Sequence, residues 1–290
     1  VKKRLLWQAH IEFTYQSQRG RTLERTGKAV LAVSWGRVDQ VAAGLLPRYR
    51  EQFGTHGLEQ ATVAQWLWGM LTHMRRRGGV MHPELAAYAA DGNVYALTKT
   101  GGRNEWLPTM GEHTPRPVFL TQGTQSGFDK LSGVRRPTWY DRWADAVLGQ
   151  QTLLGRGMAA EMYGDALQAL EAAGLLLRTA HHQGDTWALN PDGLWLHTEV
   201  AFVATPDGKR RMPVPADMAP YLMGMPCLDA PELRYALTLP PTLNWWAQRY
   251  SQGDLRRVIA AEHTGLLERK AREELEVRFK SKQPQPWFEN

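Results

Sequence analysis

Residues 138–189 carry the sequence pattern that most restricts how this chain can fold. Thr138 is a typical helix N-cap residue, and apolar residues follow it at helical spacing as far as Leu148. After a glycine-rich turn, a second helical pattern runs from Met158 to Ala173 and ends at Gly174. The pattern therefore predicts two helices separated by a short turn.

Two short strands complete this pattern. Leu175–Thr179 and Trp187–Leu189 flank a turn that contains Gly184, which is the signature of a β-hairpin. Helix, turn, helix and hairpin in this order predict a winged helix over residues 138–197. In such a module the second helix can enter the major groove of DNA, and the hairpin can touch the DNA backbone.

The charges of the second helix do not favour DNA reading. Its acidic residues are Glu161, Asp165 and Glu171. A structural winged helix that braces a larger protein is therefore at least as consistent with the sequence as one that reads DNA.

The rest of the chain is expected to be mainly helical. Residues 1–137 form a helical linker region, in which His10–Tyr15 alternates like a short extended segment. Residues 198–247 are rich in proline and loop-forming residues, and helical character resumes over 248–290. We therefore expect an α+β fold that is mainly α with small β elements.

The composition is that of an ordinary globular protein with a modest basic excess. The 290 residues include 35 Lys+Arg and 29 Asp+Glu, a net charge of +6. Arginine far outnumbers lysine, and arginine binds phosphate in a bidentate manner. A GC-rich genome would produce the same bias, so this excess permits a polyanionic partner without requiring one.

The cysteine and hydropathy patterns indicate a cytoplasmic protein. Cys227 is the single cysteine, which excludes an internal disulfide and a self-contained zinc site made of cysteines. The sequence has no apolar run of membrane-spanning length and no signal peptide. The first residue is Val1 and the last residues, Trp287 to Asn290, stop in mid-pattern, so we expect an internal fragment of a longer polypeptide.

The sequence contains no recognisable catalytic set. Nucleophile-elbow, zinc-protease and Asp-Glu nucleotide motifs are all missing. Glu12 and Glu24 are conceivable as a carboxylate pair, and with His10 as a metal site, although their spacing specifies neither. A free-standing enzyme is therefore poorly supported.

The strongest motif lies near the C-terminus. His263-Thr264-Gly265-Leu266 is followed by Arg269, Arg272, Glu274, Arg278 and Phe279. This order and spacing resembles a pattern in the second RecA-like lobe of superfamily 2 helicases. The resemblance implies that a RecA-like lobe begins within residues 248–290, with His263, Thr264, Gly265, Arg269 and Arg272 as its motif residues.

Further islands of similarity occur in the same order along the chain. They are Arg19–Gly27, Arg75–Val80 with His82-Pro83, Asp91–Asn93, the winged-helix pattern and Arg257–Thr264. Together they resemble the region between the motor lobes of large bacterial DEAD/DEAH-box helicases related to mitomycin repair factor A and to Druantia-type phage-defence helicases.

This resemblance implies a function in DNA repair or antiviral defence. The full-length protein would bind ATP and Mg²⁺ with motifs outside this chain, and this portion would link the remaining helicase lobes and contact the DNA backbone. The expected contacts are Arg19, Arg21, Arg75, Arg76, Arg77, Arg135 and Arg136, and Trp139 is a candidate for stacking on an unpaired base. The alternative is a scaffold that recruits protein partners, defence proteins among them, and barely touches DNA.

One departure from the resembled family concerns zinc. Relatives carry a small Cys-rich zinc element between the winged helix and the second lobe, whereas Val203–Leu228 retains only Cys227 here. We expect this segment to be a metal-free remnant that is stabilised by packing. Stoichiometric zinc in the purified chain would contradict that expectation.

Overall fold

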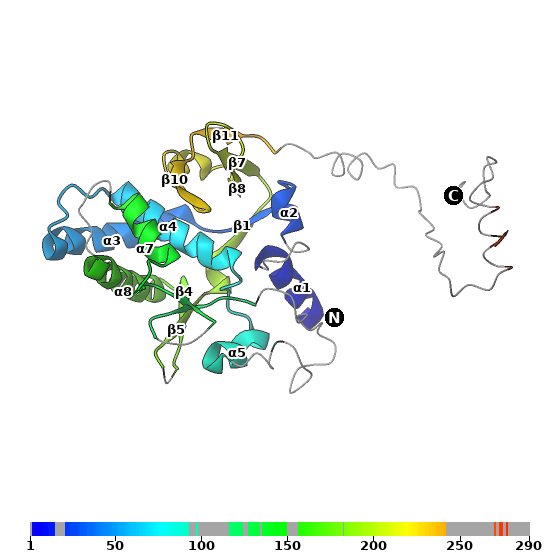
Figure 1. Cartoon of the computed structure of the whole chain (residues 1–290), viewed down its shortest axis with the longest axis horizontal. Coiled ribbons are helices and arrows are strands. Elements are labelled where there is room, and N and C mark those ends of the chain that lie inside the picture. The colour runs from blue at the N-terminus through cyan, green and yellow to red at the C-terminus, as the bar shows by residue number, and fades with distance from the viewer. Residues whose placement is uncertain are drawn as a thin grey trace. The chain divides into compact units, whose positions relative to one another are not determined.

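The computed structural model describes residues 2–14, 21–92, 97, 116–123, 127–133, 135–149, 156–181, 183–241, 270, 273, 274 and 277. The chain divides into two compact units, Val1–Thr242 and Leu243–Asn290. The first unit mixes helices with small sheets (Figure 1), which confirms the α+β class. In the second unit, the described residues Lys270, Glu273, Glu274 and Val277 have helical conformation, as the charge pattern of this segment predicts.

Four helices form the centre of the first unit. They are α3 (Trp35–Phe53), α4 (Gln60–Arg76), α7 (Trp139–Val147) and α8 (Arg156–Ala172). Trp66 donates through Nε1 to the Tyr163 hydroxyl at 3.0 Å, and Tyr163 donates to the carbonyl of Tyr140 at 2.9 Å. Because these polar groups are paired, the side chains of Trp66 and Tyr163 are buried in the core with their donors satisfied.

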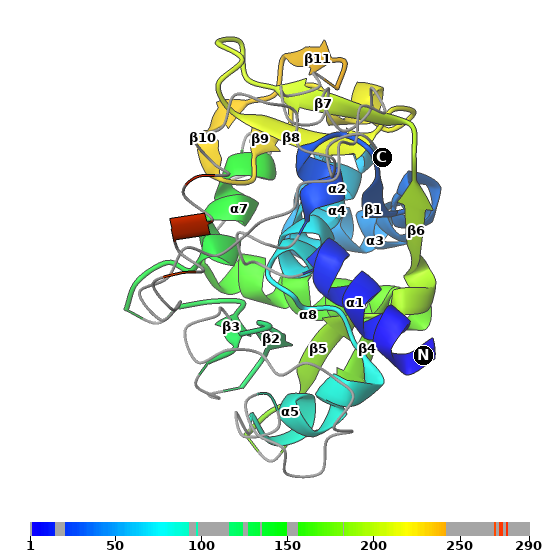
Figure 2. The same cartoon turned by 90° about the vertical axis from the view of Figure 1, so that its right-hand side faces the viewer.

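Small sheets lie on opposite sides of these helices (Figures 1 and 2). A four-stranded sheet has the order β3-β2-β5-β4, a three-stranded sheet the order β11-β7-β8, and two pairs are β1-β6 and β10-β9. Their bounds are β1 Val30–Val33, β2 Leu120–Thr121, β3 Asp129–Lys130, β4 Leu176–Thr179, β5 Thr186–Leu189, β6 Leu194–His197, β7 Val200–Ala204, β8 Arg211–Pro215, β9 Pro226–Cys227, β10 Ala230–Arg234 and β11 Leu237–Leu239. The remaining described helical elements are α1 (Lys2–Thr14), α2 (Thr22–Arg25), α5 (Ala86–Asp91) and the 3₁₀ turns Pro83–Leu85, Pro191–Gly193 and Ala219–Leu222.

The predicted order of helix, helix and hairpin occurs over residues 138–189. Thr138 caps α7 in a reciprocal capping box, because its hydroxyl accepts from the amide of Asp141 and the Asp141 carboxylate accepts from the amide of Thr138. The hairpin β4-β5 follows α8. Strand β2 pairs with the other side of β5 and extends this hairpin into the four-stranded sheet.

The proline-rich segment after residue 198 contains more strand than the sequence predicts. β8 carries Pro213 and Pro215, yet it is an edge strand of the order β11-β7-β8, where proline is tolerated. Cys227 is buried in the same region, and its burial raises the pKa of the thiol to about 11. The thiol therefore stays protonated at neutral pH.

The N-terminal segment differs from the prediction. His10 to Thr14 belong to helix α1 and are not extended; Tyr15 lies outside the described residues. Trp7 and Ile11, four residues apart, pack on one face against a cluster that includes Tyr88 and Phe119. Burial of this face favours the helical period of 3.6 over the alternating period of a strand.

Helices α4 and α7 approach each other closely at a glycine. A Cβ atom built on Gly69 would overlap the ring of Trp143, and Trp143 donates through Nε1 to the carbonyl of Trp66 at 2.9 Å. The absence of a side chain at Gly69 therefore lets α7 pack directly on the α4 backbone.

Replacement of Gly69 by Ala is expected to destabilise the fold by about 1–3 kcal/mol, because the Trp143 ring must shift within a packed core. The measurement is the free energy of unfolding in urea. Gly44→Ala is the matched control: it lies inside α3 with no atom within 4 Å of the added Cβ, so a gain of about 0.5–1 kcal/mol is expected. Equal stabilities of the two variants would contradict the α4–α7 approach.

Candidate anion-binding site

Helix α2 is positioned by a carboxylate from α1. The Glu12 side chain accepts from the Thr22 hydroxyl at 2.7 Å and from the Leu23 amide at 2.8 Å. These contacts satisfy groups at the start of α2 that have no partner within the helix. Glu12 therefore has a structural function here. This function does not support its assignment to a carboxylate pair with Glu24.

A buried ion pair then fixes α2 to the end of α4. The Arg75 guanidinium donates to Glu24 and, at 2.8 Å, to the carbonyl of Phe13. Glu24 and Arg75 are 3% and 4% exposed, so the pair is almost entirely shielded from water. The second acid of the hypothetical carboxylate pair is thus also engaged, and Arg75 is not available on the surface.

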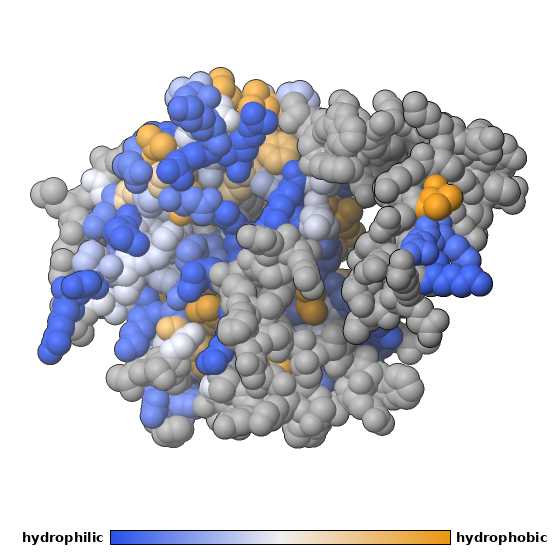
Figure 3. Space-filling view, turned by 45° about the vertical axis from the view of Figure 1, so that its right-hand side comes forward, coloured by the Kyte–Doolittle hydropathy of each residue, from blue (hydrophilic) through white to orange (hydrophobic). Residues whose placement is uncertain are grey.

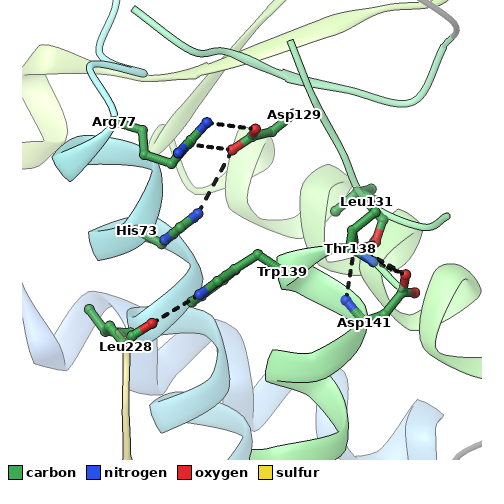
Figure 4. Close-up of polar contacts among 8 residues, drawn as sticks. All are labelled: His73, Arg77, Asp129, Leu131, Thr138, Trp139, Asp141 and Leu228. Carbon is green, nitrogen blue, oxygen red and sulfur yellow. Dashed lines mark hydrogen bonds and ion pairs between the residues drawn. The ribbon is translucent and has the colours of Figure 1, made fainter. Parts of the chain in front are cut away.

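The three consecutive arginines at the end of α4 have separate carboxylate partners. Arg76 contacts Asp229 at 2.9 Å, and both side chains are accessible to solvent. Arg77 donates through Nη2 to Asp129 at 3.1 Å, and its Nε lies 2.8 Å from the other carboxylate oxygen (Figure 4). Consecutive helical residues are rotated by about 100°, so the three side chains diverge.

Arg21, Arg75 and Arg76 meet at a cavity of about 370 Å³ between α2, the end of α4 and the β7-β8 hairpin. The cavity is lined by Arg21, Glu24, Arg25, Arg75, Arg76, Phe202, Lys209, Arg211, Met212 and Pro213. Among these described lining residues, Glu24 is the one acidic side chain. The cavity therefore has a strongly positive lining, which favours a bound anion.

Arg21 has an unusual local environment at this cavity. Its backbone has φ 57°, and it is the one non-glycine residue with positive φ among the residues that the structure describes. Burial, and next the charge of Arg76, lower the pKa of Arg21 to about 10. The side chain remains cationic at neutral pH, because a pKa of about 10 is still well above 7.

The cavity is also lined by Arg25, Lys209 and Arg211. The sequence did not indicate these three residues as DNA contacts. Lys209-Arg210-Arg211 is a visible basic run, but its relation to α2 depends on how the β7-β8 hairpin folds back. The basic run was the one feature of the sequence that could have indicated these residues as candidate anion contacts. Its membership in the site could be recognised only from the tertiary structure.

Arg77, Arg135 and Arg136 are not among the described residues that line this cavity. Arg135 and Arg136 are exposed in the loop before α7. Arg19 and the helicase-motif residues His263, Thr264, Gly265, Arg269 and Arg272 lie outside the described residues.

Trp139 packs within the protein. Its ring stacks on His73 at a centroid distance of 3.6 Å and on Trp143 at 5.2 Å, and its Nε1 donates to the Leu228 carbonyl (Figure 4). These contacts engage the ring in core packing, so the idea that Trp139 stacks on an unpaired base is not supported.

His73, which lies beside this tryptophan, is neutral. Burial, and then the charges of Arg77 and Arg76, lower the pKa of His73 to about 2. The 3.8 Å approach of His73 to Asp129, drawn in Figure 4, is therefore not an ion pair at neutral pH. The cation that Asp129 binds there is Arg77.

The described surface offers neither a metal cluster nor a membrane-spanning helix. No group of three His, Cys, Asp or Glu side chains with metal-binding geometry occurs within the described ranges. None of the described helices combines the length and the apolar character that crossing a membrane requires. Hydrophilic side chains predominate among the coloured residues in Figure 3, and hydrophobic ones form small separate groups.

No protein-family model, curated protein or solved structure matches this chain. The function is therefore inferred from the geometry of the site and from the order of the sequence motifs.

Glu24→Gln is expected to lower the free energy of unfolding by about 3–5 kcal/mol, because it leaves the buried Arg75 charge without its anion. Asp229→Asn is the control, since it breaks an exposed pair of Arg76 that is worth about 0–1 kcal/mol. Urea unfolding measures both variants. Similar destabilisation by the two substitutions would show that the Glu24–Arg75 pair is not buried.

The neutral state of His73 predicts a loss of stability in acid. Its pKa is about 2 in the folded protein and about 6.5 when unfolded. The unfolded state therefore binds more protons, and His73 contributes stability that is present above about pH 6.5 and lost as the pH falls. The slope should be about 1.4 kcal/mol per pH unit.

His73→Phe keeps the aromatic contact with Trp139 and removes the titrating group. Its free energy of unfolding should therefore depend less steeply on pH than that of the unmodified chain between about pH 6.5 and pH 5. Urea unfolding across this range measures the difference. Parallel pH profiles would mean that His73 is not buried in its neutral form.

Proposed function

We propose that this chain is the inter-lobe portion of an ATP-dependent DNA helicase or translocase and that it contacts the DNA backbone at the basic cavity. The observation that carries the proposal is the convergence of Arg21, Arg76 and Arg211 from three separate segments on one cavity. Cations gathered in a concave site attract phosphate and carry no sequence information. Binding should therefore be salt-sensitive and largely independent of sequence.

The helicase part of the proposal comes from the order of the sequence motifs. His263-Thr264-Gly265-Leu266 and the arginines after it resemble the second RecA-like lobe, and Arg19–Gly27 resembles the segment that follows the first lobe. ATP and Mg²⁺ would bind to motifs outside this chain. On the basis of this resemblance, we propose that the protein acts in DNA repair or antiviral defence and that it does so in the cytoplasm.

Within this proposal, the winged-helix pattern acts as a brace. Helix α8 is packed against α3: the Tyr49 hydroxyl donates to the Met162 carbonyl at 2.7 Å, and Arg48 pairs with Asp165 at 2.7 Å. Arg178, which follows α8 on β4, lies close to the carboxylates of Glu171 and Asp185. An acidic helix with an engaged flanking arginine supports a brace more than a DNA reader.

An apolar groove supports the alternative function, a protein-interaction scaffold. Its volume is about 770 Å³, and it lies between α1, β1 and β6, with Leu6, Phe13 and Leu196 among its lining residues. Trp195 and Leu196 are 58% and 56% exposed. Exposed apolar surface of this kind often marks an interface.

Titration of this chain with labelled single-stranded and duplex DNA at several salt concentrations tests the proposal. In Lys209→Gln/Arg211→Gln, affinity should fall for every DNA sequence alike. The slope of log K against log salt should decrease by about 1 for each phosphate that the variant no longer neutralises. The two substituted residues are exposed. Arg75 is left in place, because its removal would unfold the site.

Lys130→Gln/Arg142→Gln removes the same charge at exposed positions away from the cavity lining and is the matched control. Its salt slope should equal that of the unmodified chain. Equal decreases in affinity for both double variants would indicate a general charge effect. Absence of any salt-sensitive DNA binding would favour the scaffold.

A further inference from the structure

The shape of the basic cavity favours one phosphate group over a row of successive phosphates. Its cationic side chains surround one concave space of about 370 Å³, whereas Phe202, Met212 and Pro213 supply an apolar wall. A surface that follows a nucleic-acid backbone presents a groove along which successive phosphates lie. One recess with cations and an apolar wall matches one phosphate group with the sugar that carries it.

The charge balance of the lining favours an anion with more than one negative charge. Arg21, Arg76, Lys209 and Arg211 face the same space as Glu24, and Glu24 already pairs with Arg75. A phosphate inside a strand is a diester with one charge. A terminal phosphate carries about −1.5 to −2 at neutral pH and presents three acceptor oxygens.

Arg21 provides a specific donor for such an anion. Its Nε is buried and has no hydrogen-bond partner, and a buried donor without an acceptor is energetically unfavourable. The same residue has the left-handed backbone conformation, φ 57°, which is unfavourable for a side chain other than glycine. Both features occur at a residue that lines the cavity, and a change of the Arg21 side-chain rotamer would bring this unsatisfied donor to a bound oxygen.

Arg76 is a second donor that can be recruited at low cost. Its pair with Asp229 joins side chains that are 25% and 59% exposed, and exposed pairs of this kind contribute little to stability. A phosphate oxygen offers a charge-assisted hydrogen bond in exchange. Arg75, in contrast, is held by Glu24 and Phe13 and acts as a positioning residue.

We propose that the cavity binds the terminal phosphate of a nucleic-acid strand, with Arg21 and Arg76 donating to its oxygens. Lys209 and Arg211 neutralise the remaining charge, and the apolar wall packs against the terminal sugar. This inference rests on the proposed function, since it takes a nucleic acid as the source of the phosphate. A free nucleoside monophosphate carries the same phosphate group and sugar. The experiment below distinguishes it from the end of a strand.

The test compares single strands of one sequence that carry a 5′-phosphate, a 3′-phosphate or no terminal phosphate, each labelled at the opposite end or internally. Fluorescence anisotropy with this chain measures the dissociation constants. One of the two phosphorylated strands should bind about tenfold tighter than the unphosphorylated strand, the effect of one additional hydrogen bond to a charged group.

Arg21→Gly is the decisive variant because glycine adopts positive φ without strain, so the fold should be retained while the cation is removed. It should abolish the preference for the phosphorylated strand and leave the weaker, salt-sensitive binding. Arg142→Gln removes an exposed charge away from the cavity and should keep the preference. Urea unfolding of each variant confirms that the fold is retained.

The possible outcomes separate this inference from the proposed function. Equal affinity for all three strands, with salt-sensitive binding retained, overturns the terminal-phosphate site and leaves the DNA-backbone proposal standing. No binding of any strand overturns both. A nucleoside 5′-monophosphate that displaces the phosphorylated strand at a concentration below the dissociation constant of that strand also overturns the strand end as the occupant.

Discussion

The buried ion pair between Glu24 and Arg75 is the interaction on which the arrangement of the basic cavity depends. It joins the four-residue helix α2 to the end of α4, and Arg75 extends the link to α1 through the Phe13 carbonyl. A helix of four residues is not stable by itself in water. Its position therefore comes from tertiary contacts, which include this pair and the hydrogen bonds of the Glu12 carboxylate at its start.

This pair also explains why neighbouring arginines have different functions. Arg75 is oriented inward and neutralised by Glu24, whereas Arg76 reaches the cavity and the exposed Asp229. Arg77 is rotated further and contacts Asp129 beside the His73–Trp139 stack. One basic run thus supplies a positioning residue, a candidate anion donor and a contact to the four-stranded sheet.

Much of the local structure follows from the sequence because its signals are local. The Thr138 cap, the end of α8 near Gly174 and the hairpin after it depend on residues within one or two turns. The prediction for His10–Thr14 was wrong because apolar residues there fit both periods. Contacts of Trp7 and Ile11 with a distant cluster decide in favour of the helix. The strands after residue 198 were missed because the many prolines concealed an edge strand.

The α+β class, the helix–helix–hairpin order and the basic runs at Arg19–Arg25 and Arg75–Arg77 could be predicted from the sequence. Only the tertiary structure decided that parts of these runs surround one cavity and that Arg77 and Trp139 belong elsewhere. The physical reason is that spacing along the chain sets periodicity and caps. Which charges become buried, paired or convergent depends on the long-range packing of α2, α4 and the β7-β8 hairpin.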